Sequence, residues 1–400
     1  MGMNDVPSGE RVHIAFFGRR NAGKSSTVNA VTAQRLSVVS DTPGTTTDPV
    51  YKSMELLPIG PVVIIDTAGF DDEGELGKLR VEKTYEVLSR TDFAVLVTDA
   101  TEEIGEYENQ LIALFKKNSI PYMVAKNKSD LLSEVPAAGE NEIYISAVTG
   151  QGINELKEKI AASAKECEND RVLVSDLIET GDSCLLVIPI DKAAPKGRLI
   201  LPQQQVIRDI LEAGGIASTV RDTELDFALK TMSPKPKMVI TDSQVFGKVK
   251  DIVPEDIPLT SFSILMARYK GFLDEAVKGA AMISKLQDGD KILISEGCTH
   301  HRQCGDIGSE KLPKLLKKFT GKELEIRLTS GREYLEDLSD YAISIHCGGC
   351  MLTERDMQSR MRVAVSQGIP FTNYGIAIAY MNGILKRSLE PLNTDGRYEL

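Results

Sequence analysis

The chain has 400 residues, a formal net charge of −11 and a sequence pI of about 5.1. Hydrophobic residues make up 42% and charged residues 26%, which is typical of a globular protein of two or three domains rather than one core. The acidic balance and the absence of tryptophan argue against nucleic acid as the main partner, because phosphate binding needs basic surface and base stacking needs aromatic side chains.

The sequence also bears on the compartment. No apolar run reaches the roughly 18 residues of a membrane-spanning helix, and the first residues lack the apolar core of a signal peptide. The six cysteines are unevenly placed and do not form the regular pattern of a disulfide framework. We therefore expect a cytoplasmic protein without a membrane partner, whose cysteines bind metal or react.

The first predicted element is an apolar strand at residues 11–17, followed by a glycine-rich loop and a helix. This order is the context that a phosphate-binding loop requires, because backbone N–H groups then converge on phosphates at a helix N-terminus. In such a loop Lys24 reaches the β- and γ-phosphates and the hydroxyl of Ser25 ligates Mg²⁺. The loop residues expected at the nucleotide are Gly18, Asn21, Ala22, Gly23, Lys24, Ser25 and Ser26.

A second strand ends in the sequence DTAG at 66–69, and a polar loop around Thr46 precedes it. We expect Asp66 to hold Mg²⁺ through a water molecule and the Gly69 N–H to sense the γ-phosphate. Thr46 would complete the Mg²⁺ shell only when the γ-phosphate is present, which would make its loop a switch. The predicted catalytic residues are Lys24, Thr46, Asp66 and Gly69.

A strand predicted at 121–125 leads to the sequence NKSD at 127–130. A carboxylate such as that of Asp130 can accept hydrogen bonds from two adjacent donors on the edge of guanine, whereas adenine has no matching pair. A supporting loop follows the apolar residues at 143–145. The residues expected at the base are Asn127, Lys128, Asp130, Ser146 and Ala147. These motifs, in this order, predict a GTPase.

The pattern of elements predicts an α/β protein with three domains. A polar stretch after the helix predicted at 153–165 ends a P-loop GTPase domain at 1–168. Residues 169–262 alternate short strands and helices without a catalytic constellation, so we predict a small α/β dimerisation or interaction domain. Residues 263–400 predict a third α/β domain, which carries a metal site.

Four of the six cysteines and three of the four histidines fall between Cys298 and Cys350. Strands predicted at 291–295 and 341–345 lead into the two ends of this region. If these strands are parallel neighbours, their ligand groups converge beyond the carboxyl edge of one sheet, with a helix at 312–320 as the crossover. The spacing alone leaves tetrahedral zinc and an iron–sulfur cluster equally open. Cys304 and His301 are interpreted as bystanders.

Residues 11–160 resemble the translation-factor-like GTPases of the Era, EngA and TrmE kind. Asn21 matches the asparagine with which potassium-activated relatives bind K⁺, so the resemblance implies K⁺-stimulated hydrolysis. The alternative is that Asn21 only permits a tight turn. Phe70 stands where Ras-like proteins have a water-positioning glutamine, so we expect slow intrinsic turnover.

The whole chain, with Cys298-x-His300 followed by His346-Cys347-x-x-Cys350, resembles the HydF family of GTPases, which mature FeFe-hydrogenases. The resemblance implies an iron–sulfur cluster-binding domain, with a 4Fe-4S cluster on Cys298, Cys347 and Cys350. The remaining iron would take an exchangeable ligand. The candidates for this position are His300, His346, Glu296, Asp306 and water.

The resemblance also implies partners. The chain would be a homodimeric scaffold that carries a di-iron precursor and delivers it to apo FeFe-hydrogenase, with the radical-SAM maturases HydE and HydG as the source. Two alternatives stay open. One is a tRNA-modification or ribosome-assembly GTPase with a structural zinc domain. The other is a GTP-regulated interaction protein whose C-terminal thiols are structural.

Overall fold

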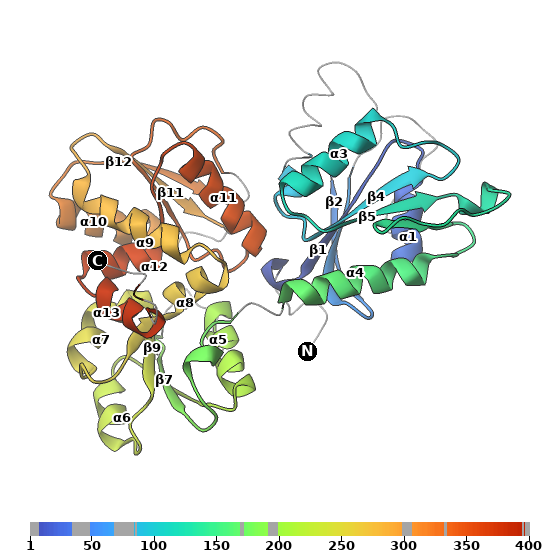
Figure 1. Ribbon diagram of the computed structural model, residues 1–400. Helices are drawn as coiled ribbons and strands as arrows, with labels where there is room; N and C mark the ends of the chain where they lie inside the picture. The colour runs from blue at the N-terminus through green and yellow to red at the C-terminus, as the bar shows by residue number, and fades with distance from the viewer. Residues whose placement is uncertain are drawn as a thin grey trace. The chain divides into compact units, whose positions relative to one another are not determined.

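The computed structural model describes residues 8–33, 49–67, 84, 86–168, 172–190, 199–297, 306–331, 334–393 and 396. The chain divides into two compact units, Met1–Asp170 and Arg171–Leu400 (Figure 1). No helix in these ranges is both long enough and apolar enough to cross a membrane. The predicted boundary at 168/169 lies close to the division between the units.

The first unit contains a six-stranded sheet in the order β2-β3-β1-β4-β5-β6. Its strands are β1 (Val12–Phe17), β2 (Val50–Leu56), β3 (Gly60–Asp66), β4 (Phe93–Asp99), β5 (Tyr122–Asn127) and β6 (Glu142–Tyr144). All neighbours are parallel except β2, which is antiparallel to β3. The continuous apolar run of β4 is buried, as expected for a strand inside a parallel sheet that is covered on both faces.

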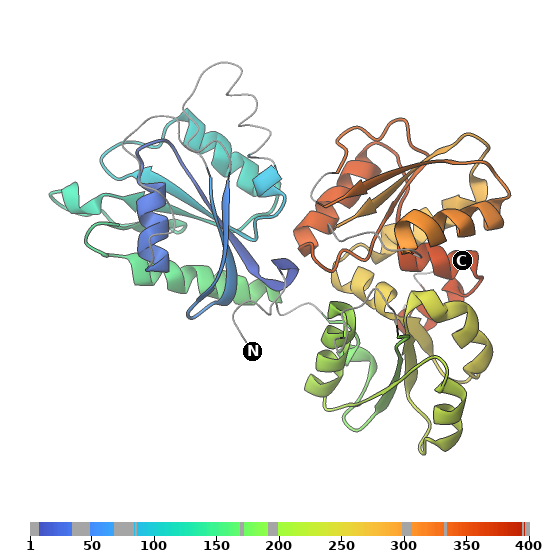
Figure 2. The ribbon, with the colours of Figure 1, turned by 180° about the vertical axis from the view of Figure 1, so that it is seen from behind.

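Helices cover both faces of this sheet (Figures 1 and 2). They are α1 (Lys24–Thr32), α3 (Glu106–Lys117) and α4 (Ile153–Glu168), with short 3₁₀ helices η1 (Ser8–Glu10) and η2 (Ser129–Leu131). Alternate residues of β1 point to opposite faces. Ile14 and Phe16 pack with α1 and α4, whereas Ala15 and Phe17 pack with α3. The phosphate-binding loop therefore lies between a buried strand and a buried helix face.

The second unit contains two parallel four-stranded sheets, and the first has the order β10-β9-β7-β8. Its strands are β7 (Ser183–Val187), β8 (Ile216–Val220), β9 (Met238–Thr241) and β10 (Leu259–Ser261). The helices of this part are α5 (Leu201–Glu212), α6 (Leu225–Thr231) and α7 (Phe246–Ile252), with η3 (Ser175–Leu177) and η4 (Ser243–Val245). This arrangement confirms the α/β character that the sequence predicted for this region.

The second sheet of this unit has the order β12-β11-β13-β14. Its strands are β11 (Lys291–Glu296), β12 (Glu325–Ser330), β13 (Ile343–His346) and β14 (Phe371–Asn373). The helices are α8 (Phe262–Tyr269), α9 (Leu273–Ala281), α10 (Leu312–Thr320), α11 (Glu354–Ser366), α12 (Tyr374–Met381) and α13 (Leu385–Leu389), with η5 (Met282–Lys285), η6 (Ile307–Lys311) and η7 (Glu390–Leu392).

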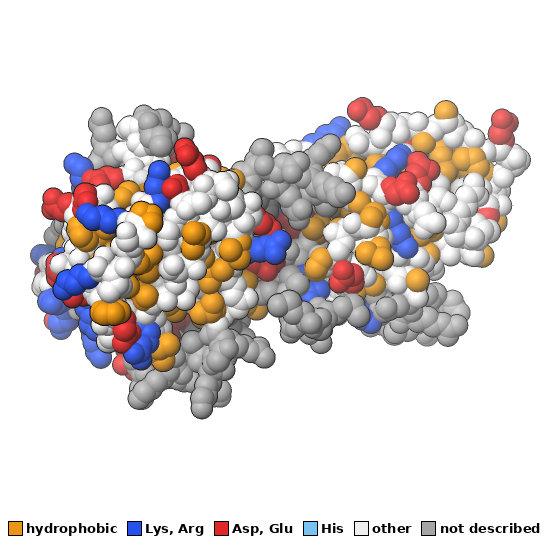
Figure 3. Space-filling view, turned by 90° about the horizontal axis from the view of Figure 1, so that it is seen from below, with side chains coloured by type: hydrophobic (Ala, Val, Ile, Leu, Met, Phe, Trp, Pro, Cys, Tyr) orange, Lys and Arg blue, Asp and Glu red, His pale blue; other side chains and the backbone are white. Residues whose placement is uncertain are grey.

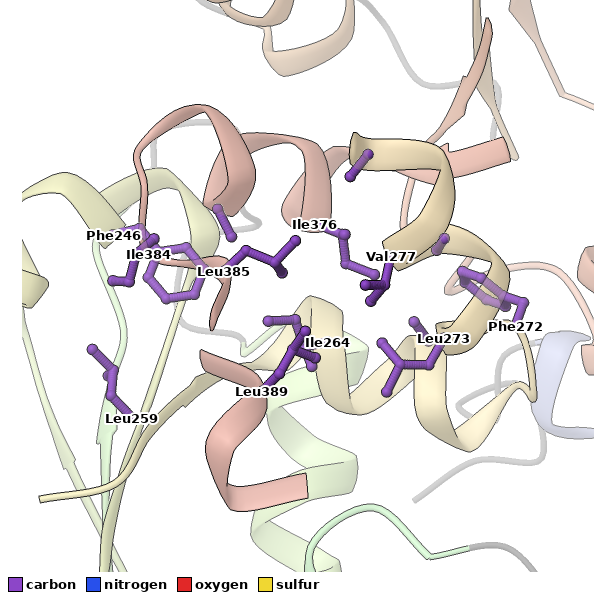
Figure 4. Packing of buried hydrophobic residues seen from close by; sticks show 14 of the residues in the cluster. Phe246, Leu259, Ile264, Phe272, Leu273, Val277, Ile376, Ile384, Leu385 and Leu389 are labelled. Atoms are coloured by element: carbon purple, nitrogen blue, oxygen red, sulfur yellow. The ribbon is translucent and has the colours of Figure 1, made fainter. Parts of the chain in front are cut away.

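One hydrophobic cluster joins the two sheets of the second unit. Leu185 of β7 and Leu293 of β11 both belong to it. Figure 4 shows its side chains gathered from α7, β10, α8, α9, α12 and α13. The boundary predicted at 262/263 falls where β10 passes into α8, inside a single compact unit.

The two strands predicted to carry the metal ligands are confirmed as β11 and β13. They are parallel neighbours, with Ser295 opposite His346. The crossover helix predicted at 312–320 is α10. It leads first to β12, an edge strand that was not predicted from the sequence, and the chain enters β13 only afterwards.

Charges of both signs share the surface. On the face of each unit that Figure 3 shows, acidic and basic side chains are interspersed with apolar ones. Interspersed charge of this kind is typical of an ordinary protein surface.

Candidate functional site

The glycine-rich loop after β1 packs closely against residues of β4 and β5. Gly18 has φ +141°, and a Cβ there would lie 2.1 Å from the carbonyl oxygen of Val97 on β4. Gly23 has φ +87°, and a Cβ there would lie 2.2 Å from Nδ2 of Asn127. Both positions therefore need glycine, for conformation and for space. Because both glycines allow close packing, the loop backbone lies directly before the N-terminus of α1.

Lys24 is buried at the start of α1. Its Nζ donates hydrogen bonds to the carbonyl oxygens of Gly18 (2.8 Å) and Arg19 (3.0 Å). The ammonium group is thus held above the loop, beside a helix N-terminus whose dipole favours anions. Phosphate oxygens can take the place of these carbonyls as acceptors.

Ser25 and Asp66 meet next to this loop. Ser25 Oγ donates to Oδ2 of Asp66 over 3.0 Å, and Oδ1 of Asp66 is buried without a hydrogen-bond partner in the described part of the chain. A buried carboxylate oxygen without a partner is costly unless a ligand satisfies it. Hydroxyl and carboxylate oxygens are the hard ligands that Mg²⁺ prefers, so the two residues fit the ion expected here.

Asn127 connects the phosphate loop to the loop after β6. Its Nδ2 donates to the carbonyl oxygen of Ala22 and its Oδ1 accepts from the Ala147 N–H, each over 3.0 Å. Ser146, fully buried, accepts a hydrogen bond from the Thr149 N–H through its Oγ. The predicted base residues on β5 and after β6 therefore lie together.

Lys128 and Asp130 follow directly. Lys128 adopts a left-handed conformation, with φ 66°, and its Nζ lies 2.5 Å from Oδ2 of Asp99. Burial acts to raise the pKa of Asp99, but hydrogen bonds from Lys128 and Thr101 outweigh it and hold that pKa below its ordinary value. Asp130 is exposed on η2, where its carboxylate is open to a ligand.

Three supporting residues were not predicted from the sequence. Asp99, at the end of β4, holds Lys128. Arg19 Nε lies 2.8 Å from Oε1 of Glu108, whose Oε2 accepts from the Gly105 N–H, so the phosphate loop is tied to the start of α3. Asp99 could have been found from the sequence, because it is a polar residue at the carboxyl end of an apolar strand. No sequence pattern indicates the Arg19–Glu108 pair.

The switch residues Thr46 and Gly69 lie outside the described ranges, as does Phe70, so their roles stay predictions. Asn21 is exposed, and its φ of 63° is in the left-handed region that asparagine tolerates. This conformation suits a tight turn and leaves the side chain available. The K⁺ role of Asn21 also stays a prediction.

The carboxyl ends of β11 and β13 meet at Cys347. Its Sγ accepts hydrogen bonds from the Gly297 N–H (3.1 Å) and the Gly349 N–H (3.3 Å). Gly297 is the residue before Cys298, which itself lies outside the described ranges, as does His300. The last described residue after β11 is therefore hydrogen-bonded to the loop that follows β13.

The chemistry of this loop fits a soft metal. Burial raises the pKa of the Cys347 thiol to about 11, although its two N–H donors act in the opposite direction. Burial also raises the pKa of Cys350, opposed by the charge of Lys270. A bound metal would favour the thiolates, and N–H···S hydrogen bonds support such ligands. The described ranges contain no group of three His, Cys, Asp or Glu side chains placed to hold a metal ion.

His346 is fully buried, and both of its ring nitrogens have protein partners. Arg360 donates to Nε2 over 2.9 Å, and Nδ1 lies 2.9 Å from the carbonyl oxygen of Cys347. Burial first, and the nearby Arg360 charge second, lower the pKa of His346 to about 3. To ligate iron, His346 would have to leave one of these partners. Arg360 was not predicted from the sequence.

The two candidate carboxylates are also engaged. Glu296 is buried at the end of β11, 3.5 Å from the hydroxyl of Tyr374. Asp306 caps η6, where its Oδ2 accepts from the N–H and the hydroxyl of Ser309. Burial, followed by the charges of Cys347, Glu296 and Asp306, raises the pKa of Tyr374 far above its ordinary range. Glu296 and Tyr374 are buried, whereas Cys347 and Asp306 are half-buried.

Three family models match the chain. They are the 50S ribosome-binding GTPase at residues 13–128, the hydrogen maturase F dimerization domain at 173–271 and the hydrogen maturase F tetramerization domain at 274–391. The second model ends at residue 271 and the third begins at 274, near the start of α9, whereas the predicted boundary at 262/263 falls at the start of α8.

Curated relatives match a smaller part of the chain. The tRNA modification GTPase MnmE of Thiobacillus denitrificans is 30% identical over 156 residues, which are 39% of this chain and 34% of the relative. The GTPase Der of Kosmotoga olearia is 32% identical over 178 residues, 40% of each protein. The match thus spans about a third to two fifths of the length of these relatives.

Among solved structures, a probable GTP-binding protein engB is 24% identical, with 39% of this chain and 100% of that chain covered and a TM-score of 0.32. A TM-score this low does not identify a relationship. The family models are more informative, because two models of one family match most of the second unit and a GTPase model matches the first. The chain belongs to the hydrogen maturase F (HydF) family of GTPases.

Proposed function

We propose that the chain is a cytoplasmic GTPase, K⁺-stimulated and slow in intrinsic turnover, that acts as a scaffold in FeFe-hydrogenase maturation. It binds a 4Fe-4S cluster, carries the di-iron precursor of the hydrogenase cofactor and delivers it to apo-hydrogenase. The maturases HydE and HydG supply the precursor. Membership of the hydrogen maturase F family supports this role.

Residues of the first unit would act on GTP mainly by positioning and electrostatics. Lys24 would exchange its carbonyl acceptors for β- and γ-phosphate oxygens. Ser25 and Asp66 would hold Mg²⁺, which neutralises phosphate charge when bound. The unpartnered Oδ1 of Asp66 supports this assignment. Thr46 and Gly69 are the proposed γ-phosphate sensors.

Recognition of guanine would fall to Asp130, whose exposed carboxylate is free to accept from two base N–H groups. The Asn127 bridge between the phosphate loop and the base loop supports this placement. Asn21 would hold K⁺ beside the phosphates, where a cation supplies the charge that an arginine finger gives in other GTPases.

The hydrogen bond from Gly297 to the Cys347 sulfur is the observation that carries the cluster assignment. It ties Gly297, the residue before Cys298, to the Cys347 loop, and this contact supports a single site for the three proposed thiolates. When bound, the cluster supplies one iron with an exchangeable ligand. Because both ring nitrogens of His346 already have partners, His300 or water is the preferred occupant of that position.

Dimerisation is assigned to residues 169–262 and cluster binding to 263–400. The matched dimerization and tetramerization models support self-association, as a homodimer or a tetramer. The alternative of a tRNA-modification or ribosome-assembly GTPase has weaker support. The matches to MnmE and Der cover about two fifths of this chain, whereas the hydrogen maturase models account for 173–391.

Anaerobic reconstitution of the full chain with iron and sulfide tests the cluster. We expect a brown protein with about four irons per chain and an EPR signal on reduction. Cys347→Ser should lose iron, whereas Cys184→Ser, in the buried first sheet of the same unit, should retain it. Colourless protein with one zinc per chain would contradict the proposal.

Transfer is tested separately. The chain produced together with HydE and HydG should activate apo-hydrogenase, and the Cys347→Ser variant should not. GTP hydrolysis should be faster in K⁺ than in Na⁺, and Asn21→Ala should abolish the difference. Equal rates in the two salts would remove the K⁺ role, and activation by Cys347→Ser would remove the scaffold role.

A further inference from the structure

Lys270 is a buried cation beside the cysteine loop. It directly follows α8 and is 4% exposed. Its Nζ donates hydrogen bonds to the carbonyl oxygens of Gly349 and Leu352. These two carbonyls lie on either side of Cys350, so a single ammonium group holds the loop at both ends.

The backbone at Lys270 is held in place as well. Gln358 Nε2, on α11, donates to the Lys270 carbonyl oxygen (3.4 Å) and to Oε1 of Glu354 (2.7 Å). The next residue, Gly271, has φ +69°, and a Cβ there would lie 2.8 Å from Gln358 Nε2. The turn that presents the lysine to the cysteine loop therefore has little freedom to move.

This contact also joins the two matched modules. Lys270 lies within the dimerization model, which ends at residue 271, whereas Gly349 and Leu352 lie within the tetramerization model. A rearrangement of α8 would therefore be transmitted directly to the loop of Cys347 and Cys350.

A buried ammonium group is costly, and an apolar side chain would fill the same space without that cost. The presence of a charged side chain at this buried position therefore points to a role beyond packing. A second buried cation, Arg360, faces the same loop through His346. Two positive charges buried beside the loop favour a negatively charged group bound there. A cluster held by thiolates is anionic, and it becomes more so on reduction.

We propose that Lys270 is a positioning residue that fixes the Cys347–Cys350 loop and, by its charge, raises the reduction potential of the iron–sulfur cluster bound there. This inference rests on the proposed function. Net charge and hydrogen bonding around a cluster set its potential. One electron from an external reductant adds a negative charge, and the ammonium group stabilises the reduced cluster more than the oxidised one.

The test is an EPR-monitored redox titration of the reconstituted full chain. Lys270→Met removes the charge and keeps an unbranched side chain, and Lys270→Arg keeps the charge. Lys278→Gln, an exposed lysine on α9, is the control. The midpoint potential of Lys270→Met should be more negative, by on the order of tenfold in the reduction equilibrium, which is about 59 mV for one electron. The Arg variant and the control should stay close to wild type.

Each outcome has a defined meaning. An unchanged potential in Lys270→Met with full iron content would overturn the inference while leaving the cluster assignment intact. Loss of iron from Lys270→Met but not from Lys270→Arg would support a need for charge at the loop. Loss from both variants would overturn the electrostatic role. Failure of the wild-type chain to bind a cluster would instead refute the proposed function itself.

Discussion

Asn127 Nδ2 donates a hydrogen bond to the carbonyl oxygen of Ala22, 3.0 Å away, although 105 residues separate the two in sequence. The other side of the same amide accepts from the Ala147 N–H. One buried side chain thus sets the spacing between the loop for the phosphates and the loop for the base. A nucleotide that spans both loops would depend on that spacing.

Asn127→Ala should therefore weaken nucleotide binding and stability together. A buried carbonyl and a part-buried N–H lose their partner, which costs about 1–3 kcal/mol of unfolding free energy, and the affinity for GDP should fall by roughly tenfold or more. Calorimetric titration and urea unfolding measure the two effects. The control is Asn109→Ala, because Asn109 is an exposed asparagine on α3 that donates a hydrogen bond to the Gly105 carbonyl oxygen. Unchanged GDP affinity in Asn127→Ala would contradict the bridging role.

Lys24→Ala should reduce GTP hydrolysis by about 10²–10³-fold or more, because the variant loses a preorganised charge at the transferred phosphoryl group. Single-turnover hydrolysis of GTP by the full chain measures the effect. Lys116→Ala, an exposed lysine in the last turn of α3, should hydrolyse GTP at the wild-type rate. Undiminished turnover in Lys24→Ala would refute the placement of the phosphates.

Asp130→Asn should lower the preference for GTP over ATP, because the amide replaces one of the two acceptor oxygens by an NH2 donor that faces a guanine donor. The ratio of kcat/KM for the two nucleotides is the measurement. Glu134→Gln, an exposed carboxylate on the following loop, should leave the ratio unchanged. If Asp130→Asn kept the wild-type ratio, another residue would have to read the base.

The parts of the fold that were predicted from the sequence have strong local signals. The strand at 11–17, the glycine-rich loop and the helix after it combine an apolar run with residues that only such a loop needs. The strands β11 and β13 were predicted from two apolar runs that are each followed by cysteine and histidine. Their parallel pairing was only a condition of the site prediction, and the structure meets that condition. In both cases a stretch of roughly ten residues around the site was enough to predict the strands and the loop.

The parts that were missed depend on distant residues. β14 has three residues and β12 is a partly exposed edge strand, so neither has a clear local pattern. Arg360 and Lys270 sit on or beside helices whose sequences look ordinary, and their importance comes from acceptors that lie 14 and 79 residues away. Lysine and arginine are usually exposed, so composition gave no reason to bury them.

The stabilisation that Asp99 gives should depend on pH. Its pKa is lower in the folded protein than the ordinary value of 3.8, because hydrogen bonds from Lys128 and Thr101 outweigh the effect of burial. The folded state therefore binds fewer protons, and the contribution is full above about pH 3.8 and is lost as the pH falls through the folded pKa. The difference in unfolding free energy between wild type and Asp99→Asn should shrink over that range. A difference independent of pH would contradict the ion pair.

Arg360→Leu should destabilise the second unit in the iron-free chain. Arg360 donates to His346 Nε2 and to the Gly331 carbonyl oxygen, and it lies over the ring of Tyr334. Removing it leaves a buried ring nitrogen and a buried carbonyl oxygen short of a donor, which costs about 2–4 kcal/mol. Urea unfolding followed by circular dichroism is the measurement.

A double-mutant cycle separates the His346 contact from the rest. His346→Leu removes the same acceptor, so the double variant His346→Leu/Arg360→Leu should be more stable than the sum of the two single effects predicts. Arg362→Leu, an exposed arginine on the same helix, should change stability by no more than about 0.5 kcal/mol. Strict additivity would mean that the two side chains do not depend on each other. In that case His346 would be free to leave Arg360 without a large cost to the fold, as it would have to do to serve as a ligand of the proposed cluster.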